Sequence, residues 1–319
     1  MKKSCTLSIL AGTAAVVLAT SLSARAEYRL EKNLKLDPGG SFVLNADEGS
    51  VTVTGMPGAG ARVVITANRE DAESFFSFGF DEGAGMARVT ARRKHHPSWG
   101  KGVSIHYEVK VPTQAQLEIK TADGNIDTSG LRGDADLGTG DGNIEVSGLV
   151  GRLTAHTGDG NINLREVSGN AEVQTNDGRI EVTALDGALS ARTGDGSIRL
   201  EKVTGDIIAR TGDGSIHIQD AGGRVEAKTG DGKVEVALVK GNARGGELET
   251  GDGSVRIVLD PAVSLNVEAS TTDSSITTNL PIKVSGVLSG SHLAGSLGSG
   301  GALLLVRAHD GPVHIEARQ

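Results

Sequence analysis

The chain has 319 residues and a formal net charge of −8, and it contains 46 glycines but only one Trp, two Tyr and five Phe. An acidic chain repels the phosphate backbone, so nucleic acid is excluded as a partner. The only cysteine is Cys5, so the chain after it has no thiol for disulfides, zinc ligation or thiol catalysis.

The start of the chain shows the three regions of a secretory signal peptide. Two lysines precede an apolar run over 7–19, and small residues follow over 24–26. We therefore predict a signal peptide over 1–26 and a mature chain over 27–319. The apolar run is shorter than the ~18 residues needed to span a bilayer. No transmembrane segment is expected after cleavage.

An aromatic-rich segment follows over 68–102. It holds four of the five phenylalanines, namely Phe75, Phe76, Phe78 and Phe80. We interpret the segment as a strand–loop–strand insertion near the N-terminal end, whose rings cap the open core. A ligand or partner surface is the alternative that the residues leave open.

From residue 121 onward the chain repeats itself with an 18-residue period. The tetrapeptide Thr-Gly-Asp-Gly, or a close variant, begins at Thr121, Thr139, Thr157, Thr175, Thr193, Thr211 and Thr229. The next copy begins at Thr250, which makes this interval longer than the others by three residues. We expect the three extra residues near 244–247, where two glycines allow a loop. Weaker copies lie at 46–53 and 308–315.

Each repeat predicts one coil of a β-solenoid. A second column of glycines marks a second turn: Gly133, Gly151, Gly169, Gly187, Gly205, Gly223 and Gly241. Between the turns, apolar and polar residues alternate, which is typical of strands with one buried face. The prediction is an all-β, single-chain β-solenoid (β-helix) of about 18-residue coils with two short strands per coil. We place its regular coils at about 117–258 and degenerate C-terminal coils at 259–319.

Stacked coils would align equivalent residues in columns at the ~4.8 Å spacing of paired strands. We predict two interior columns on one sheet: Ile126, Ile144, Ile162, Ile180, Ile198, Ile216 and Val234, then Val146, Leu164, Val182, Leu200, Ile218 and Val236. The repeated threonines should also face inward and bond to each other or to the backbone. Asn125, Asn143 and Asn161 should form a short amide ladder.

The repeated aspartates are the candidate site: Asp123, Asp141, Asp159, Asp177, Asp195, Asp213, Asp231 and Asp252. One interpretation is a turn role, in which each carboxylate accepts backbone N–H bonds in its own turn. Nearby cations could pair with this column: Lys120, Arg192, Arg210 and Lys228, with His156 at the equivalent position of another repeat. The alternative is a cation ladder, with calcium as the cation. One edge supplies few oxygen ligands for a closed calcium site, so we expect no metal site and no cofactor.

Three stretches carry a family resemblance: Tyr107 to Pro112, Leu117 to Ile126 and the closing Asp310-Gly311 copy, together with the Thr-Gly-Asp-Gly coils. The chain resembles the bacterial putative-adhesin domain family of unknown function. The resemblance implies an extracytoplasmic β-solenoid and supplies no catalytic residues. Related domains are linked to envelope-stress systems.

Enzyme signatures are missing from the sequence: it has no Gly-x-Ser-x-Gly elbow, no His-Glu-x-x-His and no phosphate-binding glycine loop. We expect an exported, non-enzymatic scaffold, periplasmic or on the cell surface, that binds protein or polysaccharide of the envelope or matrix. Two alternatives stay open. One is an envelope-stress or sensing component that binds a partner protein or cell-wall fragment. The other is a carbohydrate-active β-helix enzyme, which would need paired carboxylates on one face.

Overall fold

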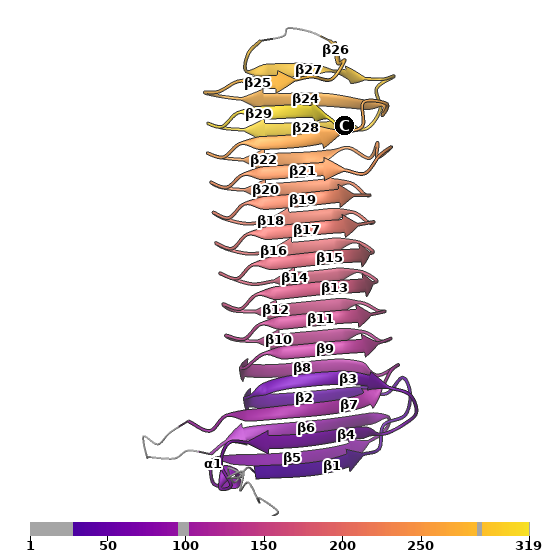
Figure 1. The fold of residues 1–319 in the computed structure, drawn as a ribbon, viewed down its shortest axis with the longest axis vertical. Helices are drawn as coiled ribbons and strands as arrows, with labels where there is room; N and C mark the ends of the chain where they lie inside the picture. Colours follow the sequence, from indigo (N-terminus) through magenta and orange to yellow (C-terminus); the bar gives the residue numbers. More distant parts are fainter. Residues whose placement is uncertain (1–27, 95–101, 286–288, 319) are drawn as a thin grey trace, which may run out of the picture.

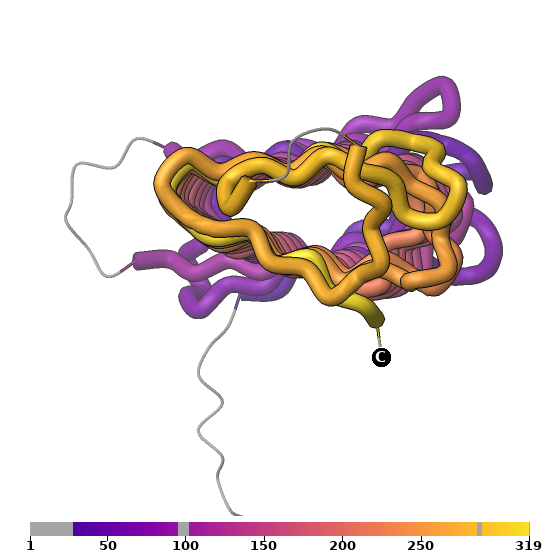
Figure 2. The backbone as a smooth tube through the Cα atoms, turned by 90° about the horizontal axis from the view of Figure 1, so that it is seen from above, coloured from indigo at the N-terminus to yellow at the C-terminus, as the bar shows by residue number. Residues whose placement is uncertain are grey.

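The computed structural model describes residues 28–94, 102–285 and 289–318. The predicted signal peptide over 1–26 lies outside these residues. Two long β-sheets stack face to face and form a tall, flattened column (Figures 1 and 2). The short helix α1 (Ala72–Phe75) lies at the N-terminal end. Among the residues described, no helix is long and apolar enough to cross a membrane.

Sheet A is the 14-stranded sheet. Its strands, in spatial order, are β1 (Tyr28–Leu34), β4 (Ala61–Ala67), β7 (Ile105–Pro112), β3 (Ser50–Met56), β9 (Ile126–Leu131), β11 (Ile144–Leu149), β13 (Ile162–Ser168), β15 (Ile180–Asp186), β17 (Ile198–Val203), β19 (Ile216–Ala221), β21 (Val234–Leu238), β23 (Val255–Leu259), β29 (Val313–Ala317) and β25 (Ile276–Thr278).

Sheet B is the 15-stranded sheet. Its strands, in spatial order, are β26 (Lys283–Val284), β27 (His292–Leu297), β24 (Leu265–Thr271), β28 (Leu303–Ala308), β22 (Gly246–Thr250), β20 (Val225–Thr229), β18 (Ile207–Arg210), β16 (Leu189–Arg192), β14 (Ala171–Gln174), β12 (Leu153–Thr157), β10 (Ala135–Thr139), β8 (Gln116–Asp123), β2 (Ser41–Glu48), β6 (Met86–Arg93) and β5 (Phe76–Gly83).

The middle of the column is built from regular coils. Each coil contributes one strand to sheet B and the next strand to sheet A, and like strands pair in parallel one coil apart. We call the turn from sheet B to sheet A the Asp turn (139–142 in one coil) and the turn from sheet A to sheet B the return turn (150–152). Ile144 pairs with both Ile126 and Ile162, so the register advances by one 18-residue repeat. The predicted β-solenoid is confirmed.

The core is a thin layer between the two sheets. All members of the two predicted interior columns are at most 2% exposed, which confirms both columns. Small residues alternate with larger ones on the sheet B side, as in Ala155, Val173 and Ala191. The outline seen along the column axis is correspondingly narrow (Figure 2). Burial of these aliphatic columns is the main stabilising contribution, at about 25 cal/mol per Å² of apolar surface.

At the N-terminal end, the order of the coils along the column differs from their order in the chain. The coil β2–β3 lies between the coil β8–β9 and the coil β6–β7. Three antiparallel strands complete this end: β4 pairs with β7, β1 pairs with β4, and β5 pairs with β6. Both sheets therefore end in antiparallel strands instead of in open parallel coils.

The aromatic segment predicted at 68–102 contains α1 and the hairpin β5–β6, which extends sheet B past β2. Phe76 is only 1% exposed, and Phe78 stacks on Tyr28 with ring centroids 5.9 Å apart. The other two phenylalanines of the segment pack against the same core. The rings cover the N-terminal end of the core, as predicted, while the strands belong to sheet B. Residues 95–101 lie outside the described part of the chain.

The C-terminal end is also reordered. The last coil, β28–β29, lies between the coil β22–β23 and the coil β24–β25 (Figure 1). Its Asp turn stacks directly on the turn that carries Asp252, because the amide of Asp310 donates to the Gly251 carbonyl over 3.0 Å. The copy at 308–315 is thus the spatial neighbour of the eighth aspartate. Strands β27 and β26 run antiparallel beyond β24.

The loop that holds the three extra residues begins earlier than predicted. Val225 pairs with Gly246, and Val234 pairs with Val255, so the longer repeat accommodates its extra length between β21 and β22. This loop covers 239–245, and Glu247 belongs to strand β22. The prediction near 244–247 is therefore confirmed for 244–245 and wrong for 246–247, which belong to β22. Gly246 cannot bulge out because its backbone approaches β20 too closely: a Cβ there would lie 2.2 Å from the Val225 carbonyl oxygen.

Candidate functional site

The eight repeated aspartates line the edge formed by the Asp turns, and all of them are exposed: Asp123, Asp141, Asp159, Asp177, Asp195, Asp213, Asp231 and Asp252. Within the described residues, none of these carboxylates accepts a hydrogen bond or forms an ion pair. The predicted turn role, in which each carboxylate bonds the backbone of its own turn, is therefore wrong. The structure places the column at one edge, as the repeat indicated, and leaves the carboxylates facing solvent.

The threonine at the start of each repeat makes the turn contacts instead. In the coil of Thr175, the hydroxyl donates to the Gly160 carbonyl of the preceding coil over 2.9 Å and accepts the Gly178 amide of its own turn over 3.2 Å. The same pair of bonds recurs at Thr157, Thr193, Thr211 and Thr229. The predicted inward threonine column, bonded to backbone, is confirmed. Because the threonine hydroxyl already bonds the backbone of the turn, the aspartate carboxylate is not needed to stabilise the turn.

The second glycine of each Asp turn is required by close packing. A Cβ on Gly178 would lie 1.8 Å from the Gly160 carbonyl oxygen, and the equivalent glycines of the other coils repeat this contact at 1.8 to 2.3 Å. Real Cβ contacts are never that short, so the turns stack only as glycine on glycine. The Asp turn is thereby fixed in shape, and its aspartate side chain is exposed.

The asparagines after the turn form the predicted amide ladder only in part, because one side-chain amide bond joins them, from Asn161 Nδ2 to Asn143 Oδ1 over 3.2 Å. The backbone N–H of Asn143 donates to Asn125 Oδ1 over 2.9 Å, and that of Asn161 donates to Asn143 Oδ1 over 2.8 Å. Arg179 ends the ladder by donating its backbone N–H to Asn161 Oδ1 over 2.8 Å. The side chain of Arg179 lines a polar hollow together with Asp177, so one cation does lie close to the aspartate edge.

The four cations predicted to pair with the aspartate column pair with other carboxylates. Lys120 lies 2.8 Å from Glu118, and Lys228 lies 2.9 Å from Glu249. The two arginines follow the same rule: Arg192 pairs with Glu172 and Arg210 pairs with Glu226. All these pairs lie along the outer face of sheet B. Side chains on a strand point away from the sheet, so they reach the neighbouring strand more easily than the turn edge.

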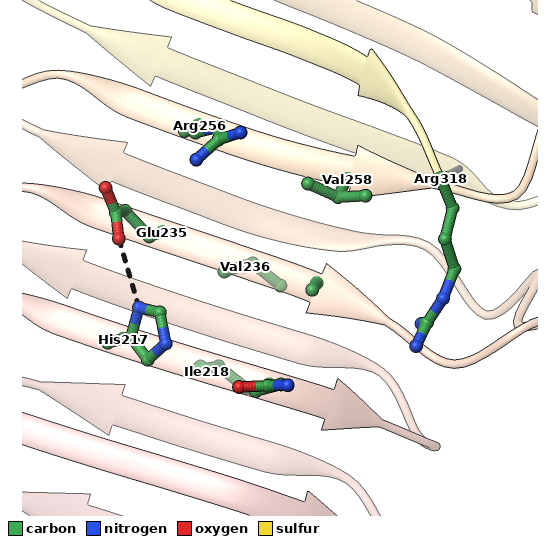
Figure 3. A pocket seen from close by; sticks show the side chains of 9 residues that line it. His217, Ile218, Glu235, Val236, Arg256, Val258 and Arg318 are labelled. Atoms are coloured by element: carbon green, nitrogen blue, oxygen red, sulfur yellow. Dashed lines mark hydrogen bonds and ion pairs between the residues drawn. The ribbon is translucent and has the colours of Figure 1, made fainter.

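A hollow on the outer face of sheet A lies near the C-terminal end (Figure 3). Ala237 and Val258 form its apolar floor, and longer polar side chains form its rim. His217 Nδ1 lies 3.0 Å from Glu235 Oε2 across the gap between β19 and β21. Arg256 on β23 continues the same column of side chains beyond Glu235, and Arg318 stands on the other side of the hollow. A small apolar group with polar substituents would fit this arrangement.

A register change creates the hollow. Strands β9 to β19 each bend at a residue with left-handed backbone: Gly130, Gly148, Glu166, Ala184, Lys202 and Asp220. Strand β21 lacks such a residue, so its pairing with β19 shifts after Gln219. The C-terminal Arg318 fills the step by donating to Asp220 Oδ1 over 2.7 Å and to the Leu238 carbonyl. Sequence reasoning missed this site, although the break of the 18-residue period after β21 signals an irregular coil.

The carboxylates at this hollow already face basic side chains. Glu235 faces His217, and Arg256 donates to Glu316 over 2.8 Å. The hydrogen bonds from Arg256 lower the pKa of the Glu316 carboxyl. Among the residues that the structure describes, no three His, Cys, Asp or Glu side chains are placed to hold a metal ion. The predicted calcium alternative at the aspartate column stays untested.

One further carboxylate pair lies on sheet A, toward the N-terminal end. Asp127 on β9 pairs in register with Glu145 on β11, so the two carboxyl groups are neighbours across one coil spacing. Partial burial raises the pKa of Asp127, the charge of Glu145 raises it further, and His106 opposes the rise. Glu145 is also paired with Arg165. The sequence pattern alone did not distinguish this pair among so many acidic residues.

Comparison with known proteins identifies the family. The Toastrack DUF4097 model matches residues 43–219 and 206–316. No curated protein is significantly similar in sequence. Among solved structures, the chain is similar to a putative cell adhesion protein from Clostridium sporogenes, with 10% identity, coverage of 91% of this chain and 100% of that chain, and a TM-score of 0.25.

Two further solved structures share this extent of similarity. A putative adhesin from Bacteroides fragilis is 11% identical, with 91% of this chain and 98% of that chain covered and a TM-score of 0.34. A putative lipid binding protein from Parabacteroides distasonis is 13% identical, with 90% and 96% covered and a TM-score of 0.37. The family match covers most of the described coils, and the chain therefore belongs to the Toastrack DUF4097 family.

Proposed function

We propose that this chain is an exported, non-enzymatic, adhesin-like scaffold that binds protein or polysaccharide of the cell envelope, surface or matrix through its long faces. The observation that carries the proposal is the register of the coils. Each outward-facing residue of a sheet pairs with the residue 18 positions further along, so equivalent surface positions recur once per coil on both sheets. A partner with a repeating structure can contact several equivalent positions at once. Contacts linked in this way combine into high avidity even when each one is weak.

The outer faces suit such a role because their charges are organised along the sheet. On sheet B, Arg192, Arg210 and Lys228 lie in one column, and each is paired with a glutamate on a neighbouring strand. Exposed pairs of this kind contribute little to stability, typically below about 1 kcal/mol. They instead present alternating charges that a polar partner can replace without unfolding the coils.

The test is binding of the exported protein to isolated envelopes, measured by cosedimentation. We expect saturable binding that weakens in steps when whole 18-residue coils are removed, because each coil adds a similar contact. Cell fractionation in parallel should recover the protein outside the cytoplasm. Turnover of a polysaccharide substrate that one carboxylate substitution abolishes would overturn the proposal in favour of a carbohydrate-active enzyme.

One observation favours an envelope-stress or sensing role as the second candidate. The hollow beside Ala237 is a single irregular feature that uses Arg318 from the end of the chain. Recognition of one small cell-wall fragment or one partner side chain would use such a feature, whereas adhesion through repeated contacts would not. Loss of envelope binding after Ala237→Trp, with coil deletions having no effect, would favour this candidate over the scaffold.

A further inference from the structure

A groove runs along sheet B beside the return turns. It consists of two adjoining hollows, one over β8 to β12 and the other over β12 to β18, that share Arg152 and Thr154 as lining residues. From Glu118 to Ile208 the groove crosses five coil spacings of ~4.8 Å, or about 24 Å along the column. It is therefore long enough for several units of an extended polymer.

The groove exists because short and long side chains alternate between coils. Ala188 and Ser190 supply short side chains in one coil. In the neighbouring coils, the equivalent positions carry Glu172 and Ile208, and Arg152 stands two coils away. Long side chains thus form the rim around a floor of short ones. The return turn tolerates this variation because its side chains point outward instead of into the stack.

The lining is rich in hydrogen-bond acceptors. It contains five carboxylates, namely Glu118, Asp134, Asp136, Glu172 and Asp206, and one lining cation, Arg152. Two cations beside the groove also pair with its carboxylates, Lys120 with Glu118 and Asp136, and Arg192 with Glu172. Two of the carboxylates are fixed by the coil above: Asp134 Oδ1 accepts the Arg152 amide over 2.8 Å, and Asp206 Oδ1 accepts the Arg224 amide over 2.8 Å. Each of these bonds uses one oxygen of the carboxylate.

This composition selects a partner that donates hydrogen bonds. Carboxylates only accept, so they pair with hydroxyl, amide or ammonium groups, and the bond to ammonium is the strongest of these. A negatively charged polymer would be repelled by the excess of carboxylates. The exposed parts of Ala188 and Ile208 add apolar surface against which the C–H face of a sugar ring can pack.

The spacing distinguishes between linear polymers. An extended polypeptide advances about 3.3 Å per residue, which is out of step with coils at ~4.8 Å. A β-linked pyranose unit is similar in length to one coil spacing, so consecutive sugars would meet equivalent positions on consecutive coils. We propose that this groove binds a linear glycan of amino sugars that lies along the solenoid axis. This inference rests on the scaffold function proposed above and assigns it a surface and a ligand class.

The test uses the exported protein and four defined oligosaccharides of equal length. They are a chitosan oligomer with free amines, its N-acetylated form, a cello-oligomer with hydroxyl groups only, and an anionic oligogalacturonate. Calorimetry should rank the affinities in that order, with no binding of the galacturonate. Ser190→Tyr, which fills the groove, should lower the affinity for the chitosan oligomer by about tenfold or more, equivalent to one strong polar contact.

Matched variants separate the groove from the face as a whole. Glu172→Gln and Glu226→Gln each remove a glutamate that pairs with an arginine on sheet B, but only Glu172 lines the groove. Glu172→Gln should weaken binding several-fold, whereas Glu226→Gln should leave it unchanged. Thr183→Tyr on sheet A is the control for Ser190→Tyr, because both add one ring to an outer face. Melting curves of all four variants should confirm that they are folded.

The groove proposal fails if no oligosaccharide binds, if the galacturonate binds best, or if Ser190→Tyr and Thr183→Tyr have equal effects. If envelopes still sediment the Ser190→Tyr protein unchanged, the groove proposal is wrong and the scaffold stands. If the chitosan oligomer binds as expected but envelopes do not sediment the protein, the scaffold proposal is wrong and the groove stands.

Discussion

The same substitution should have opposite effects at two buried threonines. Thr128 and Thr175 are 3% and 1% exposed, and both face the core. Thr175 donates to the Gly160 carbonyl and accepts the Gly178 amide. In the residues that the structure describes, Thr128 Oγ1 is the one buried side-chain oxygen or nitrogen without a hydrogen-bond partner. Its neighbours in the column are Val53 and Val146, so the hydroxyl lies among methyl groups.

Valine has nearly the shape of threonine, so the change in stability follows the hydroxyl. Thr175→Val leaves one buried N–H and one buried C=O without this partner, and an unsatisfied buried group costs about 1–3 kcal/mol. We expect a loss of about 2–4 kcal/mol in the free energy of unfolding, since relaxation recovers part of the sum. Thr128→Val removes an unsatisfied hydroxyl and should raise the free energy of unfolding by about 1 kcal/mol.

Equilibrium denaturation by guanidinium, followed by circular dichroism, measures both changes if the slope of the transition is the same in each variant. Thr183→Val is the control, because Thr183 lies on the outer face of sheet A and should change stability by less than about 0.5 kcal/mol. If Thr128→Val destabilises the protein as much as Thr175→Val, the hydroxyl bonds do not decide stability at these positions. The role assigned to the threonine column would then be wrong.

Four further outcomes follow from the coil geometry. Gly178→Ala should prevent stacking of the coils. Gly138→Ala should be tolerated, because its Cβ would lie 3.7 Å from the nearest atom. Equal expression and equal melting temperatures of the two variants would contradict the packing argument. Deletion of residues 160–177 removes one whole coil and should leave a folded protein, whereas deletion of half a coil should unfold it. If circular dichroism shows both deletion variants unfolded, the coil register is wrong. The pKa of Asp127 is higher in the folded state than its unfolded value of 3.8. The charged carboxylate therefore destabilises the folded state above the folded pKa, and this cost is absent below pH 3.8, where the group is protonated in both states. Asp127→Asn should therefore stabilise the protein slightly at pH 7, by less than about 1 kcal/mol, and not at pH 3, and equal gains at both values would refute this cause. Calcium should raise the melting temperature no more than matched ionic strength does; a larger, calcium-specific rise would support the cation ladder.

The regular coils were predictable because their period fixes the pairing of each strand. Once Ile126 and Ile144 are recognised as equivalent positions of successive repeats, the buried columns and the inward threonines follow from alternation alone. The hydrogen-bond partner of the turn amide was not predictable, since a threonine hydroxyl and an aspartate carboxylate compete for it. Only the geometry shows that the Thr175 hydroxyl accepts this bond. The position of the extra loop also required the close approach at Gly246, which the sequence does not display.

The order of coils at both ends could not be predicted for a different reason. A local period specifies which residues pair across neighbouring coils but not which segments become neighbours when the period is broken. The coil β28–β29 fits next to β22–β23 because Gly311 repeats the tight glycine contact: a Cβ on it would lie 1.8 Å from the Gly253 carbonyl oxygen. Any other Asp turn could make the same glycine-on-glycine contact, so this contact does not specify which coil becomes the neighbour. The reordering also brings Arg318 to Asp220 and thereby builds the hollow on sheet A.

The distribution of variation within the repeats indicates where binding specificity lies. At the Asp turn, the stacked glycines and the threonine hydroxyl fix the backbone, and the exposed side chain is an aspartate in all eight coils, so this most repeated motif is chiefly structural. At the return turn, equivalent positions carry chemically different residues: Asp134, Arg152, Asn170, Ala188, Asp206 and Arg224. These side chains lie outside the buried core, and those of Asp134, Asn170 and Asp206 accept a backbone amide of the next coil. A surface on which side chains vary while the backbone repeats is suited to distinguishing one polymer from another, so we expect the selectivity of the proposed binding to lie beside the return turns and not at the aspartate edge.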